Sequence, residues 1–286
     1  MTLALAFATA RMLKENNLVR LLRACETMGN ATVICSDKTG TLTQNKMSVV
    51  AGFMGANEEF GDLPSESVKS EGSSPPSASI TDTLKTFPSG VTDLVLHSLA
   101  LNTTAFEETR ETGREFVGNK TEIALLQLAS QYLGMDLAEV QGGNPIEHVY
   151  PFDSSRKAMA VVYRLPSGYR FLVKGAPELM LNAATRILHQ GSGEIPTQDI
   201  SPDDRRCISD RVDAYARASL RTIGIAYRDL ATWPSGSEHQ AAFDDIFEDM
   251  TWVGAFGIHD PLRPEVSDAI KNCHSAGVQV KMVTGT

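Results

Sequence analysis

Two short apolar segments constrain the fold most, because each lies near an end of the chain and runs directly into a loop of small polar residues. Residues 31–35 precede the loop that begins Ser36-Asp37-Lys38, and residues 278–283 precede residues 284–286. Short, bounded apolar segments of this kind suit buried strands of a parallel sheet. Because open α/β sheets bind ligands beyond the carboxyl ends of their strands, we expect Asp37 at a ligand-binding edge.

The segments beside these strands have helical or strand patterns of their own. Apolar residues at helical spacing in residues 14–30, with Gly29 placed to stop the helix, predict a helix before the first strand. Before the last strand, residues 252–258 predict another buried strand, and Pro264 suits the first position of a helix that reaches about residue 276. Both ends of the chain therefore indicate one α/β domain.

The residues between these ends predict a second domain, of mixed α-helix and antiparallel β-sheet, that interrupts the first. The predicted strands are residues 148–152, 157–164, 169–174 and 221–227, and the predicted helices are residues 119–133, 177–188 and 203–220. Residues 61–83 are rich in Ser, Pro, Gly and acidic side chains, which predicts a disordered insertion without a packing role.

Composition argues against several classes of partner. The chain has 286 residues and a net charge of −9, whereas nucleic acid and anionic membrane surfaces need clustered Lys and Arg. Its 4 cysteines have no CxxC spacing and indicate neither a zinc site nor a disulfide framework. The apolar residues 1–13 are too few to span a membrane. They could be the cytosolic end of a longer transmembrane helix or a buried turn of helix.

The loop after the first strand carries the residue types of phosphoryl transfer. A carboxylate followed by small hydroxyl residues and glycine suits attack of Asp37 on phosphorus to give an aspartyl phosphate. Mg²⁺ bridging Asp37 and the phosphoryl group is implied, because this chemistry depends on charge neutralisation. A phosphatase would need a second carboxylate where this chain has Thr39, so we expect the acyl phosphate to persist. The alternative is a polar turn that merely follows a strand.

The sequence around this loop is similar to that of a known family. DKTGTLTQNKM resembles the phosphorylation motif of the P-type ATPases, which are ion-transporting pumps. Further segments over essentially the whole chain resemble the calcium-transporting branch, in its plasma-membrane and fungal vacuolar type: NNLVRLLRACETMGNATVICS, GNKTEIALL, FDSSRKAM, VKGAPE, LRTIGIAYRD, GIHDPLRPEV and VKMVTG. GNKTE and KGAPE disfavour a pump of the heavy-metal type.

The resemblance implies an α/β fold in which an incomplete haloacid-dehalogenase-like phosphorylation domain, with a parallel sheet, is interrupted by a nucleotide-binding domain. The nucleotide-binding domain would be mixed α+β with an antiparallel sheet. The implied boundaries are residues 1–13 for the end of a transmembrane helix, 14–50 and 251–286 for the phosphorylation domain, and 51–250 for the nucleotide-binding domain.

The resemblance also implies roles for individual residues. Asp37 would be the nucleophile of a catalytic motif shared with Lys38 and Thr39, and Mg²⁺ would be held by Asp37 and the backbone carbonyl of Thr39. The positions by which the family holds ATP correspond here to Glu122, Phe152, Lys157, Lys174, Gly175, Arg221, Thr284 and Gly285. Asp260 and Arg263 are expected to shape the hinge between the domains.

The nucleotide-binding candidates also have purely structural interpretations. Glu122 occupies the position of the acidic member of a capping box at a helix start. Phe152 could belong to the core, although Lys157 nearby favours an aromatic and cationic site for a purine and its phosphates. Lys174 could be a solvated strand end, and Arg221 could form a surface ion pair.

The chain departs from the family at Thr286, where the family's TGD sequence has Asp, and we expect a fragment or a truncated product. Three functions remain open. The first is the cytosol-facing catalytic portion of a pump in the vacuolar or plasma membrane that uses ATP to move Ca²⁺ out of the cytosol. The second, which we expect of the isolated chain, is a nucleotide-binding module without turnover. The third is a phosphohydrolase of the haloacid dehalogenase type, which Thr39 and the large insert disfavour.

Overall fold

The computed structural model describes residues 2–14, 16–64, 78–110, 113–233 and 242–283, which belong to two compact units. The central unit is the continuous segment from Lys46 to Asp260. The terminal unit combines the residues up to Asn45 with those from Pro261 onward.

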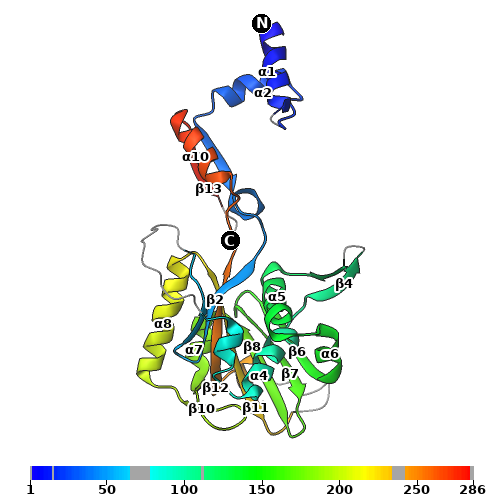
Figure 1. Cartoon of the computed structure of the whole chain (residues 1–286), viewed down its shortest axis with the longest axis vertical. Helices are drawn as coiled ribbons and strands as arrows, with labels where there is room; N and C mark the ends of the chain where they lie inside the picture. Colours follow the sequence, from blue (N-terminus) through cyan, green and yellow to red (C-terminus); the bar gives the residue numbers. More distant parts are fainter. Residues whose placement is uncertain (1, 15, 65–77, 111–112, 234–241, 284–286) are drawn as a thin grey trace. The chain divides into compact units, whose positions relative to one another are not determined.

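A nine-stranded sheet forms the middle of the central unit (Figure 1). Its strand order is β10-β9-β12-β11-β8-β7-β6, while β2 pairs with the second half of β12 and β3 pairs with β2. Neighbouring strands are antiparallel except β9 and β12, which are parallel. The strands are β2 (Ser48–Met54), β3 (Glu58–Gly61), β6 (Ile146–Asp153), β7 (Ala158–Arg164), β8 (Tyr169–Gly175), β9 (Ala184–Leu188), β10 (Thr197–Asp199), β11 (Arg221–Leu230) and β12 (Met250–His259).

Helices cover both faces of this sheet, so the central unit has three layers. The helices on one face are α3 (Ile80–Leu84), α4 (Ser89–Ala100), α5 (Lys120–Leu133) and α6 (Leu137–Gly143). The helices on the other face are α7 (Pro177–Ala183), α8 (Pro202–Arg217) and α9 (Phe243–Ile246). A separate antiparallel hairpin consists of β4 (Phe106–Arg110) and β5 (Gly113–Val117).

Strand β7 shows why the core has two halves. Successive side chains of a strand point to opposite faces, so Val161 packs with the α4 and α5 layer while Val162 packs with the α7 and α8 layer. Both valines are fully buried. The same alternation on β8 places Lys174 on the face of Leu172, toward α5.

Local capping explains where the long helices begin and end. Ser201 and Asp204 form a reciprocal capping box at the start of α8. The side chain of Asn119 caps α5, and the helix ends where Gly134 adopts the left-handed conformation with a φ of 65°. These elements confirm the helices predicted at residues 119–133 and 203–220.

The terminal unit contains a two-stranded parallel sheet. Strand β1 (Val33–Asp37) pairs with β13 (Gln279–Val283), so that Asp37 lies opposite Val283. Its helices are α1 (Thr2–Lys14), α2 (Leu22–Gly29) and α10 (Val266–Ser275). The first and last predicted strands are thus present, but both are largely exposed rather than buried, and β1 covers residues 33–37 instead of the predicted 31–35. In the described part of the chain, no helix combines the length and hydrophobicity needed to cross a membrane.

Two predicted helix starts differ from the structure. The helix predicted over residues 14–30 is shorter, since α1 ends at Lys14 and Asn16 adopts the left-handed conformation that asparagine tolerates. Helix α2 then begins at Leu22 and ends at Gly29, which confirms the predicted stop. The helix expected from Pro264 begins two residues later, at Val266.

The helix predicted over residues 177–188 is wrong in its second half. Helix α7 ends at Ala183, and the next five residues form β9. Ile187 of β9 pairs with Trp252 of β12, and both side chains are buried. Tertiary pairing of apolar residues that also suit a strand therefore overrides the helical pattern.

The insertion predicted as disordered over residues 61–83 needs correction at its end. Residues 65–77 lie outside the described residues, but residues 80–83 belong to α3. Ser79 caps this helix, and Ile80 and Leu84 are buried in the core. The insertion thus does contribute to packing.

The strand predicted over residues 252–258 is present as β12 but belongs to the central unit. It pairs antiparallel with β11 and β2 instead of joining a flanking parallel sheet. It therefore lies within the compact unit that extends from Lys46 to Asp260. The strands predicted at 148–152, 157–164, 169–174 and 221–227 are confirmed as β6, β7, β8 and β11.

Candidate functional site

Four strands of the central sheet meet at one place through their hydrogen-bonding register. Asp153 at the end of β6 pairs with Ala158 at the start of β7, and Ala158 pairs with Gly175 at the end of β8. Gly175 in turn pairs with Gly224 near the start of β11. This end of the sheet contains most of the predicted nucleotide-binding residues: Phe152, Lys157, Lys174, Gly175 and Arg221.

The closest association between predicted residues is an ion pair. Lys174 Nζ donates a hydrogen bond of 2.9 Å to Glu122 Oε1. Lys174 is 5% exposed and Glu122 is 6% exposed, so the two charges are withdrawn from solvent together. The interpretation of Lys174 as a solvated strand end is wrong. The pair joins β8 to the first turn of α5.

Thr104 completes the surroundings of Glu122. Its hydroxyl donates to Glu122 Oε2 at 2.6 Å, and its backbone N–H donates to the same oxygen at 3.2 Å. Glu122 therefore accepts hydrogen bonds from Thr104 and Lys174. The side chain that caps the start of α5 is that of Asn119. Sequence reasoning missed Thr104, because a threonine pair after a helix is an ordinary loop signal.

The pKa values of the ion pair reflect burial opposed by pairing. Burial opposes ionisation of Glu122, but the charge of Lys174 and the hydrogen bonds from Thr104 outweigh it and hold the pKa of Glu122 below its ordinary value. Burial lowers the pKa of Lys174, and the Glu122 carboxylate partly opposes that change.

Three predicted residues at the same end of the sheet are exposed: Phe152, Lys157 and Arg221. The Phe152 side chain is 62% exposed on β6, the edge strand, so the alternative that it belongs to the core is wrong. Arg221 donates to the hydroxyl of Thr121 at 2.9 Å, next to Glu122 on α5. Lys157 has a left-handed backbone, and its carbonyl accepts from Ala176 at 3.0 Å. Lys157 is exposed.

Gly175 permits a close approach of two strands. A Cβ at this position would lie 2.4 Å from the carbonyl oxygen of Lys157 and 2.8 Å from the Cα of Ala158. Because both contacts are to backbone, no side-chain movement could relieve them. The glycine is thus needed for the β7 and β8 ends to meet.

The predicted catalytic motif lies in the terminal unit. Asp37 is the last residue of β1 and is exposed, and the helical loop η1 (Lys38–Leu42) follows it directly. Gly40 adopts a φ of 80°, a left-handed conformation that glycine accepts without strain. The carbonyls of Gly40 and Thr41 accept from the guanidinium of Arg263 at 2.9 and 3.1 Å. Arg263 therefore braces the loop that follows Asp37.

The remaining predicted residues are Asp260, Thr284 and Gly285. Asp260 accepts from the backbone N–H of Lys46 at 3.2 Å, within the central unit. Thr284 and Gly285 lie outside the described residues. Within the ranges described, no group of three or more His, Cys, Asp or Glu side chains could hold a metal ion. Asp37 thus offers a single carboxylate, which suits Mg²⁺ only if phosphate oxygens complete its coordination.

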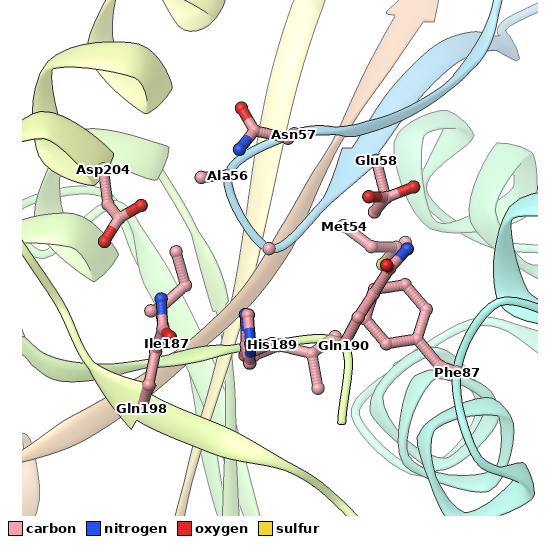
Figure 2. A pocket seen from close by; sticks show the side chains of 12 residues that line it. Met54, Ala56, Asn57, Glu58, Phe87, Ile187, His189, Gln190, Gln198 and Asp204 are labelled. Carbon is pink, nitrogen blue, oxygen red and sulfur yellow. The ribbon is translucent and has the colours of Figure 1, made fainter. Parts of the chain in front are cut away.

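A pocket of about 140 Å³ lies elsewhere in the central unit (Figure 2). It is lined mainly by the turn between β2 and β3, by the end of β9 and the residues that follow it, and by Asp204 of α8. None of the predicted nucleotide-binding residues lines it. The candidate site is therefore an open surface at the end of β6, β7, β8 and β11, and not this pocket.

Comparison with known proteins gives a family match. Residues 90–265 match the family model described as P-type ATPase, cytoplasmic domain N. The chain is 42% identical over 303 residues to calcium-transporting ATPase 2 of Schizosaccharomyces pombe, and 39% identical over 294 residues to plasma membrane calcium-transporting ATPase 4 of Homo sapiens. Each alignment covers 99% of this chain but only 23% and 22% of the relative, respectively. The chain thus spans less than a quarter of the length of these relatives.

Proposed function

This chain belongs to the P-type ATPases, and we propose that its central unit binds ATP at the end of the sheet around Lys174 and Glu122. One observation supports this more than any other. The end of the sheet that holds the buried ion pair also carries an exposed aromatic ring and two exposed cations, on strands brought together by their register. A purine with a phosphate chain offers the exposed ring and the two exposed cations chemical partners.

Different side chains of the site suit different parts of the nucleotide. The exposed face of Phe152 suits stacking against the adenine ring, an interaction that depends on ring area and not on a polar edge. The cations of Lys157 and Arg221 suit the phosphate oxygens, and the planar guanidinium can bind two of them at once. The Lys174 ammonium and the Glu122 carboxylate form the polar floor beside the ring, because β8 and α5 hold them in place.

We also propose that Asp37 is the residue phosphorylated in the whole protein. A carboxylate oxygen of Asp37 attacks the γ-phosphorus of ATP, a new P–O bond forms, and the bond to the bridging oxygen breaks. ADP leaves with that electron pair, and an aspartyl phosphate remains. The exposure of Asp37 at the end of β1 supports this role. The parallel pair β1 and β13 would belong to the haloacid-dehalogenase-like phosphorylation domain of the whole protein.

Mg²⁺ is the metal that this chemistry implies. The Asp37 carboxylate and the Thr39 carbonyl would hold it together with phosphate oxygens, and when bound it neutralises charge on the transferred group. The residues of this chain contribute the oxygen ligands and the braced loop: Arg263 fixes the carbonyls of Gly40 and Thr41, directly beyond Thr39.

For the whole protein we propose a calcium pump of the vacuolar or plasma membrane, with this portion facing the cytosol. The relatives named above are calcium-transporting ATPases, and the similarity to them extends over 99% of this chain. In such a pump, phosphorylation of Asp37 would be coupled to Ca²⁺ export from the cytosol.

Calorimetric titration of the chain with ATP, with and without Mg²⁺, tests the binding proposal. We expect millimolar or tighter binding, weakened in Lys174→Ala and unchanged in Asp37→Asn, because Asp37 belongs to the other unit. Phosphate release measured alongside tests the expectation that the isolated chain binds nucleotide without turnover. A folded chain that shows no heat of binding would contradict the assignment of the site.

A further inference from the structure

Asn102 is a buried polar residue without an assigned role in the site. It lies in the loop after α4, is 1% exposed, and donates from Nδ2 to the carbonyl oxygens of Met159 at 3.2 Å and Leu172 at 3.4 Å. Its Oδ1 is buried and makes no hydrogen bond within the described residues. The two donated hydrogen bonds satisfy backbone carbonyls of the core and hold this loop against β7 and β8.

The two carbonyls that Asn102 binds belong to residues close to Lys174 in the sheet. Met159 of β7 is the register partner of Lys174, and Leu172 precedes Lys174 by two residues on the same face of β8. The Asn102 amide therefore fastens its loop to both strands at the place from which the Lys174 side chain leaves the sheet.

The same loop also reaches the partner of Lys174. Two residues after Asn102, Thr104 donates through its N–H and its hydroxyl to Glu122, and Glu122 accepts from Lys174. Asn102 and Thr104 thus fix the same loop at two points. Asn102 holds it to the backbone of β7 and β8, and Thr104 holds it to Glu122, which is paired with Lys174 of β8. Any movement of the loop at Asn102 would shift the Glu122 carboxylate relative to the Lys174 ammonium.

We propose that Asn102 is a positioning residue for nucleotide binding, which acts through Thr104 and Glu122 on Lys174. This inference rests on the proposed function of the central unit. Asn102 does not touch the nucleotide, because it is fully buried. It sets the geometry of the two charged side chains that form the polar floor of the site.

A double-mutant cycle in the full 286-residue chain tests this inference. The variants are Asn102→Leu, Thr104→Val and the two combined, each titrated with ATP by calorimetry under conditions where urea unfolding shows it to be folded. We expect Asn102→Leu to weaken ATP binding about tenfold, on the scale of one lost hydrogen bond. The combined loss should be clearly smaller than the product of the two single losses, because both changes act on Glu122.

Val162→Ala provides the matched control for loss of stability. Val162 is fully buried on β7, but its side chain packs in the opposite half of the core. We expect it to lower the free energy of unfolding and to leave the Kd for ATP unchanged.

Asn102→Asp keeps the inference testable if Asn102→Leu does not fold. The new carboxyl group would face two carbonyl oxygens, so only its protonated form can donate to one of them. Its Kd for ATP, divided by that of the unmodified chain at the same pH, should fall as the pH is lowered from about 8 to about 6.

Each contrary result has a distinct meaning. An unchanged Kd in Asn102→Leu, combined losses that equal the product, or a ratio for Asn102→Asp that does not vary with pH would overturn the positioning role and leave ATP binding intact. A folded, unmodified chain that binds no ATP would overturn both the positioning role and the proposed function.

Discussion

Lys174 Nζ lies 2.9 Å from Glu122 Oε1, and this ion pair connects the end of β8 with the first turn of α5 across 52 positions of sequence. Both residues are buried, and the exposed ring of Phe152 lies on the neighbouring edge of the same sheet. The pair is thus part of the fold and of the candidate site at once, and substitutions can separate the two roles.

Lys174→Met should destabilise the central unit strongly. The substitution leaves the Glu122 carboxylate buried without its cation, which we expect to lower the free energy of unfolding by about 3 kcal/mol. Both tryptophans, Trp233 and Trp252, belong to the central unit, so their fluorescence during urea unfolding reports on this unit alone. Lys157→Met, at an exposed lysine, is the control and should change little. Equal effects of the two substitutions would contradict the pairing.

The ion pair should also make stability depend on pH in the acid range. The pKa of Glu122 is held below its ordinary value of 4.5 in the folded chain, so its contribution is fully present above that pH. The contribution is lost as the pH falls through the lowered pKa. The difference in unfolding free energy between the unmodified chain and Glu122→Gln should therefore shrink as the pH falls from about 5 toward about 3. A difference that stays the same over this whole range would argue against a lowered pKa.

Gly175→Ala should destabilise the meeting of β7 and β8. The added Cβ would meet the carbonyl oxygen of Lys157 at 2.4 Å, and we expect a loss of about 1–3 kcal/mol in the free energy of unfolding. Gly143→Ala, at the end of α6 with no atom within 4 Å of the added Cβ, is the matched control. Urea unfolding of both variants decides the matter. A Gly175→Ala chain as stable as the control would mean that the strands can separate freely.

Phe152→Ala should weaken ATP binding without destabilising the fold. Its ring is 62% exposed, so its removal should change the free energy of unfolding by less than about 0.5 kcal/mol. Loss of stacking on the base should raise the Kd for ATP about tenfold. Val149→Ala, at another exposed apolar residue of β6, should leave the Kd unchanged. If both substitutions weakened binding equally, Phe152 would have no specific contact with the nucleotide.

The sequence predicts best those elements whose signals are local. The helix over residues 119–133 has an asparagine cap and a glycine stop, and the strands over 157–164 and 169–174 flank a proline-containing turn. Strand β9 could not be predicted, because its residues follow a helix without a stop signal and become a strand only through pairing with β12. Helix α3 could not be predicted either, because its buried residues directly follow a polar, proline-rich segment.

The sequence predicts which residues belong to the candidate site but not which of them contact one another. The chemistry of Phe152, Lys157 and Arg221 suggests a nucleotide, yet no local pattern shows that Lys174 pairs with Glu122. That pairing depends on how α5 packs on the sheet, which brings together positions far apart in sequence. Thr104 was missed for the same reason, since only the folded loop brings its hydroxyl to Glu122.

Methyl resonances of the isotope-labelled chain, recorded while ATP and Mg²⁺ are added, would locate the nucleotide without any substitution. We expect the methyl groups of Thr104, Thr121 and Ala158 to shift together with a single Kd, because these residues surround the Lys174 and Glu122 pair. The methyl groups of Ile187 and Leu188, which line the separate pocket, should stay in place. Shifts confined to Ile187 and Leu188, or none in a folded chain, would contradict ATP binding at this end of the sheet.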